Sequence, residues 1–139
     1  MAKRDKLAGV HPELVEKHAR IRAAMQILGF PMLVTDGIRT EAEQRALYEK
    51  GRTTAGPTVT DMDGSPLKRS KHQDGLAIDA CFLDQRAQPT WDLHYPWEAY
   101  GECAKALGLV WGGDWKRRDC PHVELPIKAT PSAGTRKAR

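Results

Sequence analysis

Residues 70–82 read SKHQDGLAIDACF and change from polar to apolar at Gly75. The polar half is typical of a loop, and the apolar run that follows is typical of a buried strand. Asp79 lies inside that run. An ionised carboxylate in a buried strand costs free energy unless it is paired or binds a metal ion. The stretch therefore predicts a loop that leads into a core strand, with Asp79 as either a paired carboxylate or a metal ligand.

The composition is typical of one globular domain. The chain has 139 residues, of which 40% are hydrophobic and 29% are charged, and this allows a single core of ordinary size. No run approaches the roughly 18 apolar residues of a membrane-spanning helix. The N-terminus also lacks the apolar segment of a signal peptide. We expect no stable membrane insertion and no Sec-type export.

Charge and cysteine content narrow the possible partners and the compartment. The 22 basic and 18 acidic residues give a net charge of +4. This excess permits attraction to anionic polymers but is too small to imply nucleic-acid binding. The three cysteines contain no CxxC pair, and an odd number is a poor disulfide framework. We expect synthesis in a reducing compartment and no nucleic-acid partner, with a Cys81–Cys120 disulfide left open as an alternative.

The order of elements along the chain favours an α+β fold with a small antiparallel sheet. Thr40 and Glu43 have the spacing of a capping box at the start of a helix. Helices are expected at 11–28, 40–50 and 95–108, and strands at 31–38, 75–82, 109–115 and 122–125. The first helix is expected to have one mainly apolar face, whose residues recur at helical spacing: Leu14, His18, Ile21, Met25 and Leu28. A long loop, 51–70, is of a kind that is often functional. We expect one catalytic domain, 1–127, followed by a basic, disordered tail, 128–139.

Two histidines and two aspartates flank the predicted strands. A catalytic zinc site needs three protein ligands and an open position for water. His72 and Asp79 supply two candidates, and His122 begins a strand that we expect to pair with the strand 75–82. Asp119, three residues before His122, is a candidate for the general base of a metal hydrolase. Each residue also has an ordinary interpretation, as a polar strand end, a hydrogen-bonded carboxylate or a turn residue.

Two longer patterns carry a family resemblance. Residues 70–79 fit Ser-x-His-x-x-Gly-x-Ala-x-Asp, and WGGDWKRRDCPHVEL at 111–125 fits Trp-Gly-Gly-Asp-Trp followed by Asp-x-x-His. Together they resemble the zinc peptidases of the D-alanyl-D-alanine carboxypeptidase and L-alanyl-D-glutamate endopeptidase family, an M15-type family. TDGIRTEAEQRALYEKGRT at 35–53 and LAGVHPEL at 7–14 resemble its phage endolysin branch. The resemblance spans about residues 7–126.

The resemblance implies a metal centre and a catalytic base. It implies that His72, Asp79 and His122 bind one catalytic Zn²⁺. It also implies that Asp119 is the base, at a position where many relatives have Glu. The chemistry would be attack of a zinc-activated water on an amide carbon, with Asp119 accepting the proton and passing it to the leaving amine.

The resemblance implies three further residues of the substrate cleft. Arg39 matches the family arginine that holds the substrate and polarises the scissile carbonyl. Ser70 matches a substrate-contacting serine, and Gln44 is a further candidate for the same wall of the cleft. The family fold is a small α+β domain with a central antiparallel sheet, which agrees with the order of elements.

The resulting expectation is a zinc-dependent phage endolysin that cleaves the stem peptide of peptidoglycan, at the L-Ala–D-Glu bond, and so lyses the host cell. We expect a monomer that is made in the host cytoplasm and reaches the periplasmic cell wall through a holin. One alternative is a D,D-carboxypeptidase or D,D-endopeptidase acting at D-Ala. The others are a non-catalytic virion or metal-binding domain of the same fold, and a nucleic-acid-binding protein, which would show a steep salt dependence.

Other residues near these patterns have several possible roles. Asp114 and Glu124 are candidates to orient the metal ligands, although Glu124 is expected to face solvent. Trp111 and Trp115 are expected to pack in the core or at the rim of the site, with the lining of a sugar or peptide groove as the alternative. Three histidines have no ligand spacing and are expected to be structural or exposed: His11, His18 and His94.

Overall fold

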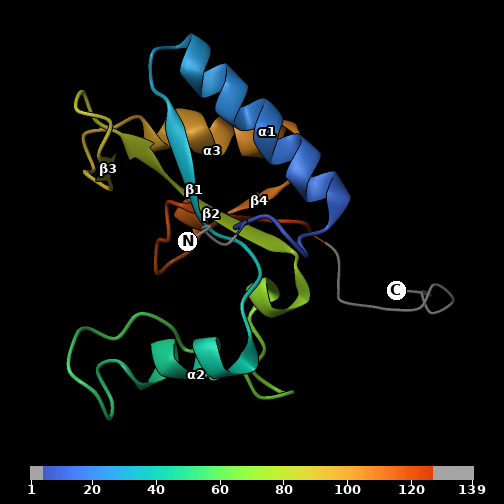
Figure 1. The fold of residues 1–139 in the computed structure, drawn as a ribbon, viewed down its shortest axis with the longest axis vertical. Helices are drawn as coiled ribbons and strands as arrows, with labels where there is room; N and C mark the ends of the chain where they lie inside the picture. The colour runs from blue at the N-terminus through green and yellow to red at the C-terminus, as the bar shows by residue number, and fades with distance from the viewer. Residues whose placement is uncertain (1–4, 127–139) are drawn as a thin grey trace, which may run out of the picture.

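Strand β2 (Ala77–Leu83) lies at the centre of a five-stranded sheet in the computed structural model, which describes residues 5–126 (Figure 1). It pairs with β1 (Met32–Asp36) and with β5 (His122–Glu124), and β4 (Val110–Trp111) lies beyond β5. The short β3 (Pro89–Thr90) also pairs with β2, and all four pairings are antiparallel. The predicted α+β class with a central antiparallel sheet is confirmed.

The register of β2 brings three polar residues to one level of the sheet. Asp79 is paired with Asp36 of β1 on one side and with His122 of β5 on the other. The β1 pairing is irregular just before Asp36, where a bulge shifts the register. Side chains alternate along a strand, so Ile78 and Val123 lie on the opposite face, where both are fully buried. A strand that is part of the core therefore presents one carboxylate to a polar site.

Helices α1 (Pro12–Ile27) and α3 (Trp97–Ala106) pack against each other and against the sheet (Figure 1). The predicted apolar face of α1 is confirmed, because its buried residues recur at helical spacing: Leu14, His18, Ile21 and Met25. Leu28, which we expected on that face, caps the helix and is exposed. In α3, Gly101 lies directly under Trp111, whose ring atoms would be 2.2 Å from a Cβ at that position. The absence of a side chain there lets the Trp111 ring pack in the core.

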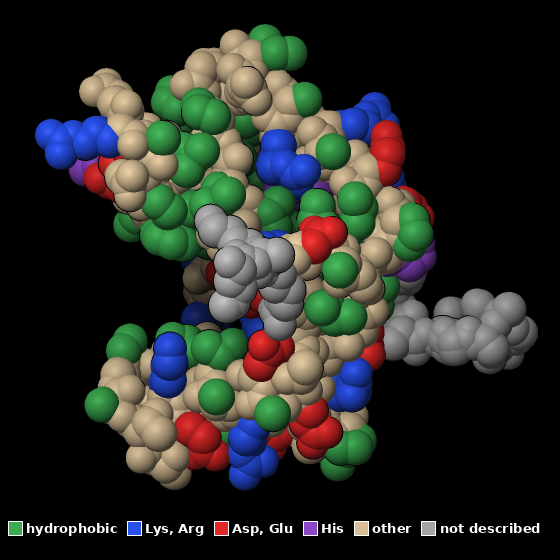
Figure 2. Space-filling view, in the orientation of Figure 1, with side chains coloured by type: hydrophobic (Ala, Val, Ile, Leu, Met, Phe, Trp, Pro, Cys, Tyr) green, Lys and Arg blue, Asp and Glu red, His purple; other side chains and the backbone are tan. Residues whose placement is uncertain are grey.

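Helix α2 (Glu41–Glu49) and the loop 51–70 lie apart from α1 and α3 (Figure 1). The capping box of Thr40 and Glu43 is formed as predicted. The loop is joined to the β4–β5 segment by Arg117, which donates to the Thr58 carbonyl at 2.9 Å and pairs with Asp61 at 3.1 Å. Figure 2 shows that the surface is hollowed between this part of the molecule and the part that contains the sheet.

The boundaries of several elements differ from the predicted ones. The strand expected at 75–82 begins at Ala77, because a 3₁₀ helix, η1 (Lys71–Asp74), and a left-handed Gly75 precede it. The strand expected at 109–115 is only the two residues of β4, followed by the 3₁₀ helix η2 (Gly112–Asp114). Strand β3 was not predicted, since two residues carry no alternation to detect. The predicted tail, 128–139, lies outside the described residues. Within residues 5–126, no helix is both long and apolar enough to cross a membrane.

Candidate metal centre

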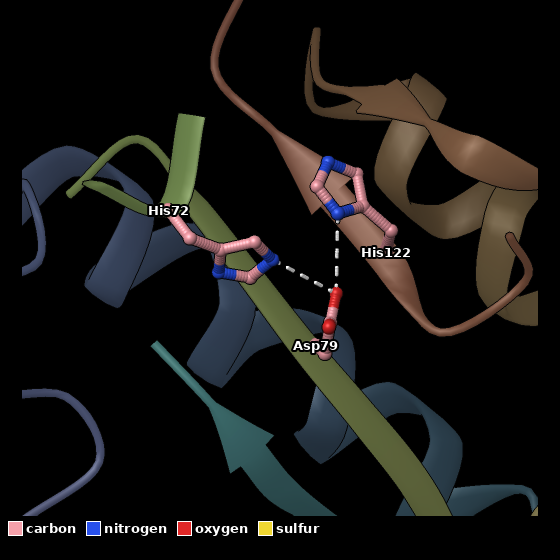
Figure 3. A group of neighbouring side chains, drawn as sticks. All are labelled: His72, Asp79 and His122. Atoms are coloured by element: carbon pink, nitrogen blue, oxygen red, sulfur yellow. Dashed lines mark hydrogen bonds and ion pairs between the residues drawn. The ribbon is translucent and has the colours of Figure 1, made fainter. Parts of the chain in front are cut away.

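His72, Asp79 and His122 come together from η1, β2 and β5, with one potential ligand atom of each lying within 4.8 Å of the others. Figure 3 shows both imidazole rings directed at the Asp79 carboxylate. His72 Nε2 is 3.3 Å and His122 Nδ1 is 3.2 Å from the same oxygen, Asp79 Oδ1. Two nitrogens and a carboxylate oxygen are ligands that zinc accepts. The structure therefore brings together the three residues that the sequence singled out.

The backbone of η1 holds His72 in place. Ser70 caps this turn, with its Oγ accepting a hydrogen bond from His72 N at 3.2 Å, and Ser70 N donates in turn to Gln73 Oε1 at 2.9 Å. Gly75 ends the turn at a φ of 71°, and a Cβ there would lie 2.5 Å from the Gly9 carbonyl oxygen. Only glycine fits this position without strain. The Ser and Gly of the sequence pattern thus shape the turn that presents His72.

The hydrogen bonds of His72 leave one nitrogen available. Its Nδ1 lies 2.7 Å from the Gly37 carbonyl oxygen, and a carbonyl only accepts, so Nδ1 carries the proton in the neutral ring. The lone pair is then on Nε2. That atom is buried and has no hydrogen-bond partner among the described residues. An unpartnered buried acceptor beside a carboxylate is costly unless a cation is bound there, so these residues fit a divalent metal ion.

A tight approach of two backbone segments holds His122. A Cβ on Gly112 would lie 2.5 Å from the Asp119 carbonyl oxygen and 3.1 Å from the Cβ of His122. The Asp119 amide donates to the Gly112 carbonyl at 2.9 Å, and the His122 amide donates to the Asp119 carbonyl at 3.1 Å. The first glycine of Trp-Gly-Gly-Asp-Trp therefore makes room for the turn that carries Asp119 and His122. Its role is steric, and the spacing of the pattern alone does not reveal it.

The residues of the centre shift one another's protonation. Burial opposes the ionisation of Asp79, yet the charges of the two histidines and the hydrogen bond with His122 hold its pKa well below the usual range. Burial likewise opposes the charging of His122, but hydrogen bonds to Asp79 and Glu124 raise its pKa to about 9. The centre thus holds a fixed negative charge facing imidazole nitrogens. A divalent cation would replace the proton on the nitrogen that faces Asp79.

Asp119 lies at the open side of the centre. Its Oδ2 is 3.9 Å from His122 Nδ1, and its side chain is 48% exposed. Burial of part of the carboxylate, together with the negative charge of Asp79, raises the pKa of Asp119. A carboxylate that is accessible and holds a proton more readily than usual suits a general base.

Arg39 is fixed beside the same cluster. It forms an ion pair with Asp36, its Nη2 is 3.9 Å from Asp79 Oδ2, and its Nη1 donates to Gln44 Oε1 at 2.6 Å. Gln44 is only 1% exposed, and its Nε2 donates to the Met62 carbonyl at 2.7 Å. These contacts suit the positioning of Arg39 and of the loop after α2, whereas direct contact between Gln44 and a substrate would need more exposed surface.

Two acidic residues at the centre were missed or misjudged. Asp36 was not singled out, although its pairing with Arg39 three residues later is a short-range signal. The expectation that Glu124 faces solvent is wrong, because its Oε1 lies 2.8 Å from His122 Nε2. His122 and Glu124 are two residues apart on a strand and so share a face, which the alternation of β5 could have indicated.

The remaining expectations near the centre have mixed outcomes. Trp111 is buried in the core, and its Nε1 donates to the Cys120 carbonyl at 2.8 Å. Trp115 is 39% exposed, with its ring 5.0 Å from that of His122, so it lies at the rim of the centre. Asp114 pairs with Lys105 on the surface at 3.1 Å. The three cysteines are free, so the alternative Cys81–Cys120 disulfide is not formed.

Comparisons with known proteins agree with this geometry. Residues 63–125 match the family model described as D-alanyl-D-alanine carboxypeptidase, of the M15 peptidases. The peptidoglycan L-alanyl-D-glutamate endopeptidase CwlK of Bacillus subtilis is 37% identical over 125 residues, which cover 84% of this chain and 73% of CwlK. The matched segment of the family model includes all three clustered residues.

Solved structures show the same fold. The L-Ala D-Glu endopeptidase ChiX of Serratia marcescens superposes with a TM-score of 0.60 at 30% identity, over 86% of this chain and 83% of ChiX. The vancomycin resistance D,D-pentapeptidase VanY in complex with Zn(II) gives a TM-score of 0.61 at 16% identity, over 84% of this chain and 72% of VanY. With the identity to CwlK extending over most of both sequences, this chain belongs to the M15-type family of peptidoglycan metallopeptidases.

Proposed function

We propose that this protein is a zinc-dependent endopeptidase that hydrolyses the L-Ala–D-Glu bond of peptidoglycan stem peptides. The observation that carries the proposal is the convergence of three potential ligand atoms, one of which, His72 Nε2, is buried and has no hydrogen-bond partner among the described residues. The proposed bond is the one that CwlK and ChiX, both at least 30% identical to this chain, are named for cleaving.

We assign the ligand roles to His72, Asp79 and His122, through Nε2, a carboxylate oxygen and Nδ1. When bound, a zinc ion supplies Lewis acidity that polarises the scissile carbonyl and lowers the pKa of a water molecule from about 15.7 towards about 7. The protein contributes a fixed tautomer at His72, set by the Gly37 carbonyl, and an ionised Asp79. Both are in place before any metal arrives, so little reorganisation is needed on binding.

Asp119 is assigned as the base that accepts the proton from the attacking water and returns it to the leaving amine. Its exposed carboxylate faces the same side of His122 as Asp79 does. Arg39 is assigned to the developing negative charge on the scissile carbonyl oxygen, where one correctly placed donor contributes a few kcal/mol. Asp36 and Gln44 hold the Arg39 guanidinium in position. Ser70 is proposed to contact the substrate from the edge of the η1 turn that it caps.

We propose that an extended peptide binds in the hollow between the α2 region and the part of the molecule that contains the sheet (Figure 2). Trp115 lines the rim on the side of His122. We further propose that the enzyme acts as a monomeric phage endolysin, made in the host cytoplasm and released to the cell wall through a holin. This biological role is supported by the resemblance of residues 7–14 and 35–53 to the endolysin branch.

A second candidate activity has one specific observation in its favour. The family model that matches residues 63–125 carries the description D-alanyl-D-alanine carboxypeptidase. An enzyme of that specificity would release D-Ala from the end of the stem peptide. The two activities use the same metal centre and give different products, so product analysis separates them.

The test is mass spectrometry of the soluble products from purified Gram-negative peptidoglycan. The protein is used as purified, after chelation, and after zinc has been added back. We expect peptides with a new N-terminal D-Glu, lost on chelation and restored by zinc. Release of free D-Ala would replace the proposal with the second candidate. Absence of any product from the zinc-loaded protein would contradict both.

A further inference from the structure

Glu124 lies between the two parts of the chain that carry the histidines of the centre. Its side chain is 14% exposed, and its two carboxylate oxygens contact different partners. Oε1 lies 2.8 Å from His122 Nε2, and Oε2 lies 3.5 Å from Lys71 Nζ. Lys71 immediately precedes His72 in η1. The carboxylate therefore connects β5 to the turn that presents the other histidine.

The contact with His122 determines which ring nitrogen can bind a metal ion. An ionised carboxylate accepts hydrogen bonds only, so His122 Nε2 is the donor and carries a proton. In the neutral ring the lone pair is then on Nδ1, the atom that faces Asp79. Without the carboxylate, the ring could place its proton on Nδ1 and donate to Asp79. That tautomer cannot bind zinc at Nδ1.

Lys71 fixes the carboxylate from the other side. Its Nζ also donates to the Leu125 carbonyl at 3.2 Å, so one ammonium group contacts two successive residues of the chain around the end of β5. Leu125 N donates to the Leu76 carbonyl at 3.0 Å, which ties the same two segments together through the backbone. Ala77 lies directly opposite Glu124 in the sheet, so Glu124 is held in register with the strand that follows η1.

We propose that Glu124 is a positioning residue for the metal centre, which fixes the tautomer and orientation of His122 and is itself anchored by Lys71. This inference rests on the proposed zinc-binding role of His122. Carboxylates that accept the second N–H of a ligating histidine commonly change metal affinity by about 10- to 100-fold when removed. Glu124 touches no reacting atom in this account, so its effect must appear in zinc binding itself.

The test is the zinc dissociation constant, measured by competition with a fluorescent chelator and independently of peptide cleavage. Glu124→Ala should bind zinc about 10- to 100-fold more weakly than wild type. Glu124→Gln retains an oxygen that can accept from His122, so it should recover much of the affinity. Lys71→Met should weaken binding by less than Glu124→Ala does. The matched control is Glu16→Ala, which removes an exposed carboxylate that pairs with Arg20 on α1.

A second readout separates positioning from general stability. Cobalt substituted into wild type and variants reports ligand geometry through its visible absorption, and the spectrum of Glu124→Ala should differ from those of wild type and Glu16→Ala. Thermal unfolding of the metal-free proteins identifies any variant that fails to fold. If Glu124→Ala fails to fold, the comparison with wild type is made with Lys71→Met, which should still bind zinc more weakly. Equal zinc affinity in wild type, Glu124→Ala and Glu16→Ala would overturn the inference alone. Failure of wild type to bind zinc would overturn the proposed function as well.

Discussion

His18 and His72 are both fully buried histidines, but their surroundings differ in one decisive respect. His18 lies between α1 and α3 with both ring nitrogens in hydrogen bonds, to Arg22 at 2.6 Å and to the Tyr100 hydroxyl at 2.8 Å. His72 has a hydrogen-bond partner only at Nδ1, whereas its Nε2 lies 3.3 Å from Asp79 Oδ1 and has no hydrogen-bond partner among residues 5–126. Burial therefore does not distinguish a structural histidine from a metal ligand. An unsatisfied lone pair beside a carboxylate does.

The network around His18 is complete in itself. Arginine only donates hydrogen bonds, and the Pro121 carbonyl only accepts them. These two groups stand at the ends of the network, so they determine which group donates in each hydrogen bond between them. Arg22 donates to His18 Nδ1, His18 Nε2 donates to Tyr100, and the Tyr100 hydroxyl donates to Pro121 at 2.9 Å. Burial, and then the charge of Arg22, lower the pKa of His18 to about 3. The network supports the turn before His122 without offering any group to a metal.

The largest expected effect is that of removing the histidine with the unsatisfied nitrogen. His72→Ala should reduce zinc affinity by more than the roughly 100-fold upper range for outer-shell residues, because a ligand itself is lost. Hydrolysis of peptidoglycan should fall below detection. Zinc content after dialysis, measured by atomic absorption, checks the first point. His18→Gln is the matched control and should retain one zinc per chain. Retained zinc in His72→Ala would show that the unsatisfied nitrogen of His72 does not bind the metal.

Asp119 tests whether the metal centre also contains a base. Asp119→Asn preserves size and polarity but cannot accept a proton, so turnover should fall by about 10²- to 10⁴-fold. Zinc content and the thermal unfolding curve should stay close to those of wild type. The check is kcat on a soluble stem peptide, with zinc measured on the same sample. Normal kcat in this variant would remove Asp119 from the mechanism.

Substitutions at Arg39 and Gln44 test whether the Arg39 guanidinium acts in catalysis or only in the local structure. Arg39→Ala should lower kcat by about 10²- to 10³-fold, because the cation near the scissile carbonyl is lost. Gln44→Ala should act in the same direction with a smaller effect, since Gln44 only holds the guanidinium. Arg45→Ala, which breaks an exposed pair with Glu49 on α2, is the control and should leave kcat unchanged. An unchanged kcat/KM in Arg39→Ala would assign Arg39 to the Asp36 ion pair alone.

The smallest effect concerns the stability of the His18 network in acid. The unfolded chain takes up a proton on His18 below a pH of about 6.5, whereas the folded chain does so only near 3. The contribution of His18 to the free energy of unfolding is therefore full above a pH of about 6.5. It is lost as the pH falls from about 6.5 to about 3. Gln at position 18 cannot be protonated. The free energy of unfolding of His18→Gln should therefore fall with decreasing pH by about 1.4 kcal/mol per pH unit less than that of wild type. Urea unfolding at pH 6, 5 and 4 checks this, and parallel curves would contradict a neutral buried His18.

The sequence predicted the fold where its patterns are long. The apolar face of α1, the capping box of α2 and the run in β2 all span several residues, and each element is present. Strand β3 and the shortened β4 escaped prediction because two-residue strands are defined by their partners in the sheet and have no period of their own. Their existence depends on tertiary pairing with β2 and β5.

The grouping of the site residues was predictable, while its supporting contacts were not. His72, Asp79 and His122 were identified from residue type and spacing, and the pairing of Asp79 with His122 in the sheet explains why they meet. The contact of Glu124 with Lys71 joins residues 53 positions apart, and no local pattern reports it. The buried state of Gln44 depends likewise on how the loop 51–70 folds back over α2.

The most direct test of the account is the anomalous diffraction of crystals of the zinc-loaded protein, recorded on both sides of the zinc absorption edge. We expect one strong peak within bonding distance of His72 Nε2, His122 Nδ1 and the Asp79 carboxylate, with no peak at His18. A zinc peak elsewhere, or occupancy that persists at this position in His72→Ala, would contradict the claim that the unsatisfied nitrogen marks the metal centre.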